Sequence, residues 1–507
     1  MKKLATLLLA AGMIFGVSTG ANAIDFKAHG QWIMSFDYGQ NGRFTGDNGS
    51  TGYNGRGNGG SEDEFEARQR VRLQLDAVAS EALSGTVYFE LGDQIWGRAD
   101  QGGALGADGN NVVEVRRAYI DWMIPQTDIK VRMGLQGLAL PSFTQGSQII
   151  DDDVAAVVAN FKFNDNVSLT AFWARPYNDN GGWTNNHGTT YNNYMDNVDM
   201  FALVLPLTFD GVKVTPWAMY AALGPGAVDG NIGGVSAGWY RRGMYPVGGA
   251  LHKDGNPDGR VNTRYGDAWW AGLTGEVTAF DPLRIAWDIN YGSVSYERSR
   301  ADRHGWFASL LAEYKLDWGI PGIYGWYSSG DDGNPANGSE RMPVIHANGN
   351  NGFSNFAFNG NPYIAREATL SKSMIGTWGI GARLKDMSFL ENLKHTLRVN
   401  FIGGTNSTTM TRYLGRNDDF VDAYNGANAA GAFGMPNLYM TTNDYAMEFG
   451  LFSQYKMYDN FTIALDMNYI ATWIDHSNKV WGRTAFNRDD DTVKDPWNIN
   501  LSFVYEF

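Results

Sequence analysis

The stretch WNINLSFVYEF, residues 497–507, shows the pattern that decides the fold. Apolar residues, most of them aromatic, occupy every second position from Trp497 to Phe507, and mostly polar residues lie between them. Because successive side chains of a β-strand point to opposite faces, this stretch predicts a strand with one apolar face. In a soluble sandwich that face would point into the core, whereas in a membrane barrel it would point toward lipid.

The segment 65–76 repeats the alternation, but its polar face is strongly basic. Arg68, Arg70 and Arg72 lie on one face of this segment, and the other face is apolar except at Gln69. Three arginines on one face are difficult to place in a dry core, but a water-filled lumen would solvate them. The segment therefore favours the barrel.

The same period can be traced through the whole chain. It predicts an all-β protein, a transmembrane antiparallel up-and-down β-barrel of 16–18 strands, with 18 favoured. Sixteen would result if two neighbouring segments were merged. The expected strands are 25–38, 64–79, 85–96, 112–124, 129–136, 155–163, 167–175, 198–205, 212–221, 267–280, 283–296, 305–316, 322–329, 371–385, 395–406, 441–457, 461–473 and 496–507.

The connections between these segments come in two sizes. Short turns are typical of the periplasmic end of an outer-membrane barrel, and long loops of the extracellular end. The short connections are 80–84, 125–128, 164–166, 280–282 and 458–460, and the long ones are 39–63, 97–111, 176–197, 222–266, 330–370, 407–440 and 474–495.

Residues 1–23 have the parts of an export signal. Lys2 and Lys3 precede the apolar run 4–17, and Ala21-Asn22-Ala23 forms a cleavage site. A single transmembrane anchor is the alternative, but the run is short for one. We expect a cleaved signal peptide, followed by one barrel domain at 24–507 in the cell outer membrane.

The composition argues against several classes of protein. The chain has no cysteine, which excludes disulfides, thiolate metal sites and a cysteine nucleophile. Its net charge of -14 argues against a nucleic-acid partner. After the signal, no apolar run reaches the length of a spanning helix, so only a closed barrel could cross a membrane.

The segment 137–154 is too apolar for a freely solvated loop. It carries Leu138, Leu140, Pro141, Phe143, Ile149 and Ile150, and it ends in Asp151, Asp152 and Asp153. We expect it to fold into the barrel and to hold its carboxylates over the channel. The opposing wall is expected to carry Arg68, Arg70, Arg72, Arg117 or its neighbour Arg116, Lys130 and Arg132.

Such a charged constriction would filter ions. The alternative is that the aspartates end a solvated loop and that the basic residues are ordinary lumen side chains.

These features together resemble the trimeric general porins of Gram-negative bacteria. The resemblance rests on the signal peptide, the long loop after the fifth strand, the arginine-bearing second strand and the terminal Phe507. The stretch 26–36 and the closing strand are most similar to the outer-membrane homotrimeric porins of sulfate-reducing bacteria.

The resemblance implies a homotrimer, a constriction formed by the third long loop, and contact with membrane lipid and lipopolysaccharide. It also implies insertion by the outer-membrane assembly machinery, which recognises a last strand ending in an aromatic residue. Tyr505 and Phe507 would be the recognition residues.

Catalytic and metal chemistry find little support. The seven histidines form no H-x-x-x-H or HExxH pair, and no nucleophile motif is evident, so we expect no enzyme and no cofactor. Ca²⁺ could bind the acidic clusters at 151–153, 331–332 and 489–491, although none has EF-hand spacing.

The expected function is passive diffusion of small hydrophilic solutes and ions through a water-filled pore. One alternative is a substrate-selective channel for saccharides or anions. The other is a secreted soluble β-rich binding protein.

Overall fold

The computed structural model describes most of the chain after the expected signal peptide. The described residues are 24–41, 64–99, 102–106, 113–178, 183–184, 190–191, 197–224, 243–244, 246, 264–346, 352–365, 368–370, 372–414, 439–475, 477–481 and 495–507. The expected signal peptide at 1–23 and the acidic cluster at 489–491 lie outside them.

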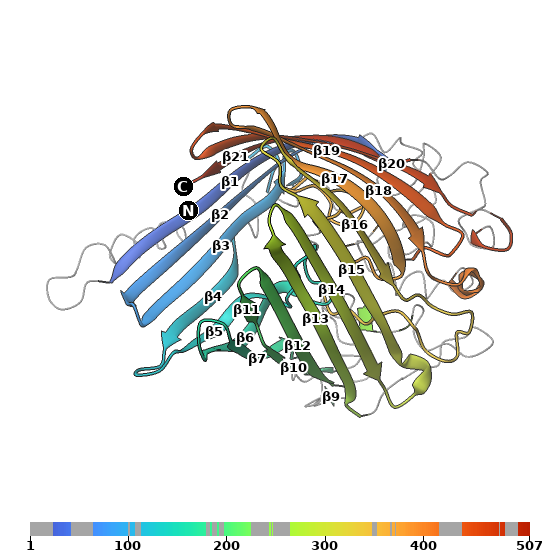
Figure 1. Ribbon diagram of the computed structural model, residues 1–507, viewed down its shortest axis with the longest axis horizontal. Helices are drawn as coiled ribbons and strands as arrows, with labels where there is room; N and C mark the ends of the chain where they lie inside the picture. Colours follow the sequence, from blue (N-terminus) through green and yellow to red (C-terminus); the bar gives the residue numbers. More distant parts are fainter. Residues whose placement is uncertain are drawn as a thin grey trace.

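The described residues form one large antiparallel barrel (Figure 1). Its first nine strands in chain order are β1 (Asp25–Gln40), β2 (Glu64–Ser80), β3 (Leu83–Ile95), β4 (Val113–Met123), β5 (Ile129–Ala139), β6 (Asp151–Lys162), β7 (Ser168–Tyr177), β10 (Val198–Val204) continued by β11 (Leu207–Phe209), and β12 (Val212–Leu223). The other nine are β13 (Gly266–Phe280), β14 (Leu283–Ser295), β15 (Arg303–Tyr314), β16 (Ile320–Ser328), β17 (Thr377–Leu390), β18 (Leu393–Gly404), β19 (Tyr445–Tyr458), β20 (Phe461–Trp473) and β21 (Trp497–Glu506).

The sheet closes on itself. Each strand pairs with its neighbour in the chain, and β10 and β11 count as one interrupted strand because both pair with β12. The last strand, β21, pairs with the first, β1, from Gln31 opposite Glu506 to Gln40 opposite Trp497. Figure 1 accordingly shows the N- and C-terminal ends of the described chain next to each other. The favoured count of eighteen strands is confirmed within the described residues.

Every predicted strand is present, and the boundaries differ by a few residues. The largest difference is at β17, which spans Thr377–Leu390 and not 371–385. β6 begins at Asp151 and not at 155, and β19 begins at Tyr445 and not at 441. A small hairpin of β8 (Trp183–Thr184) and β9 (Thr190–Tyr191) lies within the long connection predicted at 176–197. Two short 3₁₀ turns, at Ser299–Ala301 and Thr408–Met410, and the single-turn α4 (Thr411–Leu414) lie in other connections.

The connections are sorted by length, as the sequence predicts. At the barrel end where β1 begins, neighbouring strands are joined by short turns, among them 81–82, 281–282, 391–392 and 459–460. At the other end the connections are long, apart from that between β14 and β15, which spans 296–302.

The distribution of polar and apolar residues is inverted relative to a soluble protein. On β21, Ile499 and Leu501 are 39% and 37% exposed on the outer face. Asn498, Asn500 and Ser502 alternate with them and are buried inside the barrel. A barrel that presents apolar side chains outward and polar ones inward suits lipid outside and water or polar groups inside.

No helix among the described residues is both long and apolar enough to span a membrane.

Candidate functional site

Two chain segments that connect strands fold back into the barrel. We call residues 140–150, between β5 and β6, the first inner segment, and residues 352–365, between β16 and β17, the second inner segment. Leu140, Ile149, Phe353 and Phe356 from these segments belong to one large buried apolar cluster. The barrel interior is therefore partly filled by the chain itself.

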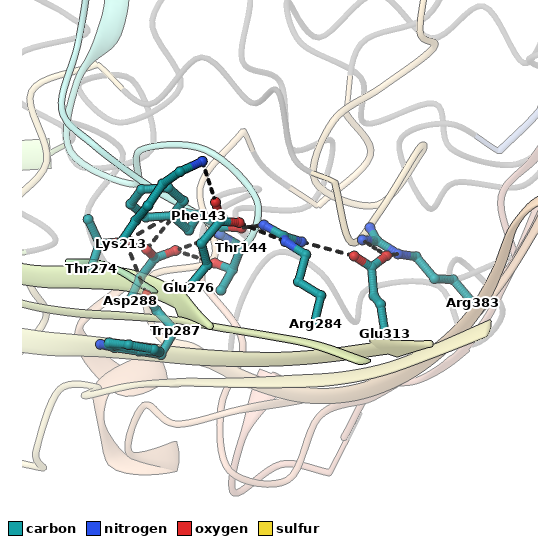
Figure 2. Close-up of polar contacts among 10 residues, drawn as sticks. All are labelled: Phe143, Thr144, Lys213, Thr274, Glu276, Arg284, Trp287, Asp288, Glu313 and Arg383. Atoms are coloured by element: carbon teal, nitrogen blue, oxygen red, sulfur yellow. Dashed lines mark hydrogen bonds and ion pairs between the residues drawn. The ribbon is translucent and has the colours of Figure 1, made fainter. Parts of the chain in front are cut away.

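A buried carboxylate, that of Asp288 on β14, accepts several of the hydrogen bonds that hold the first inner segment against the wall (Figure 2). Asp288 accepts hydrogen bonds from the Ser142 hydroxyl at 2.6 Å and from the Phe143 backbone N–H at 3.0 Å. The hydroxyls of Thr144 and of Thr274 on β13 also donate to it. These donors satisfy a carboxylate that would otherwise be costly to bury.

The second inner segment is fastened to another part of the wall, formed by β19 and β20. Glu448 on β19 accepts hydrogen bonds from the Ser354 hydroxyl at 2.9 Å and from the backbone N–H groups of Phe356 and Ala357 at 3.0 Å each. Asn361 donates to Asp466 on β20 at 3.2 Å. Each inner segment thus depends on acidic residues that face inward from the wall.

The inner segments also contact each other and the chain next to them. The Gly352 N–H donates to the Gln145 carbonyl at 3.2 Å, and the Met374 N–H donates to the Gln148 side chain at 2.8 Å. The Ile345 N–H donates to the Ile149 carbonyl at 3.0 Å. The two segments therefore form one connected body within the lumen.

Next to the inner segments, acidic and basic side chains alternate across the wall from β12 to β17 (Figure 2). Glu276 contacts Lys213 at 2.9 Å and Arg284 at 2.8 Å, and Glu313 contacts Arg284 at 2.9 Å and Arg383 at 2.5 Å. Because each carboxylate lies between two cations, like-charge repulsion along the row is offset. Arg284 and Arg383 also donate to the Phe143 and Gly352 carbonyls, which ties the row to both inner segments.

A second row of alternating charges lies on the wall from β2 to β6. Glu90 contacts Arg72 at 2.6 Å and Arg116 at 3.0 Å, and Asp153 contacts Arg116 at 2.7 Å and Arg117 at 2.6 Å. We call this row the arginine wall, together with Arg68, Arg70 and Arg132.

A β-bulge explains why both Arg116 and Arg117 reach Asp153. The pairing of β3 with β4 shifts here, since Tyr88 lies opposite Arg117 while Phe89 lies opposite Val115. A bulge breaks the strict alternation of a strand, so two consecutive side chains can reach the same face. The sequence predicted one of the two arginines, and the structure uses both.

The other predicted basic residues also have partners. Arg68 contacts Glu66, Arg70 contacts Asp93 at 3.4 Å, and Asp121 on β4 contacts both Lys130 at 3.2 Å and Arg132 at 2.7 Å.

The second inner segment also reaches the arginine wall. Arg68 donates to the Ile364 carbonyl at 3.2 Å, and Arg70 lies at the limit of hydrogen bonding from the Tyr363 carbonyl, at 3.5 Å. Burial raises the pKa of Tyr363 to about 12, so this residue brings no charge to the wall at neutral pH.

Solvent exposure varies among the side chains of the two charged rows. The side chains of Arg116, Arg117 and Arg132 are 23%, 39% and 33% exposed, whereas Glu313 and Arg383 are 9% and 7% exposed. The inner segments cover the wall around β15 and β17 and leave much of the arginine wall accessible. Lys213 and Arg284, at 50% and 31% exposed, are also accessible, so solvent reaches charges on both walls.

One predicted arrangement is wrong. Asp153 does not face the arginines across a gap, because β6 carries it on the same wall and it touches Arg116 and Arg117 directly. Asp151 and Asp152 also belong to β6, and the Asp152 carboxylate contacts His346 at 2.7 Å. The irregular part of the predicted segment 137–154 is shorter, at 140–150. That these residues form the narrowest point of the pore remains a prediction.

Sequence reasoning missed the second inner segment and Asp288. Residues 353–358, FSNFAF, carry three aromatic residues in a connection assigned to the exterior. The criterion that identified 137–154, excess apolar content in a loop, would have found it. Asp288 carries no comparable signal, because its role depends on which loop lies against it.

The predicted assembly residues lie at the barrel seam. Phe507 exchanges backbone hydrogen bonds with Gly30 on β1, at 2.9 and 3.1 Å, and its ring stacks with Tyr505 at a centroid distance of 5.8 Å. Their recognition by an assembly machinery remains a prediction.

Among the described residues, no three His, Asp or Glu side chains come together in a group that could hold a metal ion.

No protein-family model and no curated protein sequence matches this chain. Solved structures similar to it include OccK3 (OpdO) of Pseudomonas aeruginosa, with 9% identity, a TM-score of 0.47 and coverage of 95% of this chain and 96% of that one. OccAB4 of Acinetobacter baumannii has 9% identity, a TM-score of 0.47 and coverage of 96% and 100%. A BenF-like porin from Pseudomonas fluorescens Pf-5 has 9% identity, a TM-score of 0.49 and coverage of 95% and 99%.

None of these similarities tests the predicted resemblance to the homotrimeric porins of sulfate-reducing bacteria. The barrel assignment rests on the strand pairing described above.

Proposed function

We propose that this protein is an outer-membrane porin through which small hydrophilic solutes and ions diffuse passively. The observation that carries the proposal is the inverted, closed barrel, with exposed apolar residues outside and solvent-accessible charges inside. Barrels of this strand number are wide enough to leave an aqueous channel.

The separation of short turns and long connections at opposite ends of the barrel supports one orientation in the membrane. Short turns are periplasmic in such barrels, so the end with the long connections would face the cell exterior. The predicted signal peptide at 1–23 supports export to the same membrane. A secreted soluble binding protein is disfavoured because its apolar outer face would then meet water.

Planar-bilayer recording of the purified mature protein tests the proposal. We expect stepwise, ohmic conductance, and steps in groups of three would support the predicted homotrimer. Heat-unfolded protein from the same preparation serves as the control. A protein that partitions into detergent-free buffer and never conducts would contradict the proposal.

A substrate-selective channel is the second candidate, because the inner segments occupy part of the lumen and the second of them contacts the arginine wall. The arginines of this wall would attract anions, although each of them contacts a carboxylate and the field is thereby weakened. Concentration-dependent block of the current by a sugar or by a small carboxylate would favour this candidate. Unblocked current would favour the general porin.

Insertion by the outer-membrane assembly machinery, through Tyr505 and Phe507, belongs to the same proposal. The proposed function involves no cofactor.

A further inference from the structure

The outer face of the barrel has an apolar groove of about 700 Å³ that crosses β6, β7, β10, β12 and β13. Its floor is lined by four alanines, Ala159, Ala171, Ala218 and Ala271, and by the larger Leu203. They alternate along their strands with inward-facing residues such as Phe172 and Met219, which are buried. The groove therefore opens toward the surroundings of the barrel and not into the lumen.

Strand register explains the shape of the groove. Ala159 lies opposite Ala171 and Ala218 lies opposite Ala271, and Leu203 of β10 lies between Ala171 and Ala218 in the same row. Leu203 is 56% exposed, so it separates two hollows that the small side chains leave on either side of it. A second row lies two residues farther along each strand, toward the long connections. It consists of Trp173, Phe201, Tyr220 and Trp269. These aromatic side chains are 37% to 50% exposed and stand out as a rim above the alanine floor.

Polar groups lie immediately beyond this rim. The Trp173 indole N–H donates to Asp199 at 2.9 Å, and the Tyr220 hydroxyl donates to Asp267 at 2.6 Å. Arg175 donates to Asp199 at 2.8 Å and lies over the Trp173 ring. Aromatic side chains with an apolar body and a hydrogen-bonded tip are typical of the membrane interface. The groove thus lies just inside the hydrocarbon region, at the end with the long connections.

We propose that this groove binds an acyl chain of an outer-leaflet glycolipid of the lipid A type. The inference rests on the proposed outer-membrane location. A polymethylene chain fills the space over the alanines and contacts the rim, while Arg175, Asp199 and Asp267 meet the headgroup. Two carboxylates and a guanidinium together suit sugar hydroxyls and phosphates, because the carboxylates accept hydrogen bonds and the guanidinium donates them.

A second copy of the chain fits the groove less well. The protruding rim would hold the wall of a neighbouring barrel away from the alanine floor, and a void left there would lose dispersion contacts. A stable subunit contact also needs about 800 Å² of complementary surface on each partner. A flexible acyl chain can adapt to the shape of the groove, whereas the rigid wall of a second barrel cannot.

The test counts the lipid that each barrel retains. The purified mature protein is reconstituted into nanodiscs that contain hexa-acylated lipid A and phosphatidylethanolamine, then re-extracted in mild detergent for native mass spectrometry. We expect retention of lipid A by the wild type and a loss of about tenfold in the Ala171→Leu/Ala218→Leu double variant, because the new side chains occupy the space of several methylene groups.

Ala382→Leu is the matched control, since Ala382 is an exposed alanine of β17 outside the groove. This variant should retain lipid A as the wild type does. All three proteins should conduct equally in planar bilayers, because the lumen is untouched.

Three outcomes would overturn the inference: equal retention by the double variant, retention of phosphatidylethanolamine in place of lipid A, or dissociation of an oligomer in the double variant without any lipid A on the wild type. Absence of conductance from the wild type would instead overturn the proposed function.

Discussion

Asp288 connects the lumen wall to the first inner segment through a single side chain. It is 1% exposed, and all of its hydrogen-bond partners named above are donors. Such a carboxylate is stable when buried only because these donors surround it, and the donors depend equally on the carboxylate.

We predict that Asp288→Ala loosens the first inner segment. Several buried donors would lose their acceptor, at a cost of about 2–4 kcal/mol in the free energy of unfolding. Single-channel recording should show a larger mean conductance with more open-state noise. Asp210→Ala, at an exposed short turn, is the control and should behave as the wild type. Unaltered conductance and noise in Asp288→Ala would show that the segment is held by other contacts.

Glu90 offers a test of the arginine wall. Its carboxylate is shared by Arg72 and Arg116, so Glu90→Gln removes one negative charge and leaves both guanidiniums less neutralised. We expect the zero-current potential in a salt gradient to shift toward anion preference. Glu81→Gln, at an exposed turn, should cause no shift. A shift toward cations would remove this wall from the permeation path.

At the residue scale, the sequence predicted which charged side chains share a face but not which of them touch. Alternation along β2 and β5 placed Arg68, Arg70, Arg72 and Arg132 correctly, because a strand has a fixed period. Arg116 and Arg117 could not both be placed, because a bulge breaks that period and depends on the neighbouring strand.

Among the elements, the seam between β1 and β21 depends on a close approach of two residues. A Cβ atom added at Gly30 would collide with the ring of Phe507. Glycine at position 30 therefore leaves room for the last aromatic side chain of the barrel.

We predict that Gly30→Ala lowers the yield of folded barrel, because the Phe507 ring must move away from its place at the seam. The measurement is the fraction of protein that migrates as folded on unheated gels. Gly85→Ala is the matched control, since the nearest atoms to an added Cβ there lie 3.9 Å away. Equal yields from the two variants would show that the seam tolerates displacement of Phe507.

The strands could be predicted because each carries its own alternation, but the fate of the connections could not. The first inner segment was expected from its apolar content. The contacts of the second, with Glu448 and Asp466, join parts of the chain that only barrel closure brings together. A loop's partners inside a barrel are set by the whole sheet, not by local sequence.

For the whole molecule, the inverted distribution of side chains predicts that adjacent positions of β2 tolerate an added charge to different degrees. Leu73 belongs to the outer face and Gln74 to the lumen face, where its side chain donates to Asp76 at 3.0 Å. An arginine facing lipid at mid-membrane costs about 2–4 kcal/mol, whereas one in the lumen can be solvated and paired.

We therefore expect Leu73→Arg to lower the free energy of unfolding in lipid vesicles by about 2–4 kcal/mol, and Gln74→Arg to change it by less than about 1 kcal/mol. Urea titration followed by tryptophan fluorescence measures both. Equal losses at the two positions would mean that the outer face of β2 does not meet hydrocarbon.

The pairing of β21 with β1 has a consequence for how the molecule is made. A nascent polypeptide that stops before residue 497 can pair β1 only with β2, so the other edge of β1 stays free and the sheet does not close. The ring can form only after the final strand has been delivered. Loss of the final strand alone is therefore enough to leave the barrel open along its side.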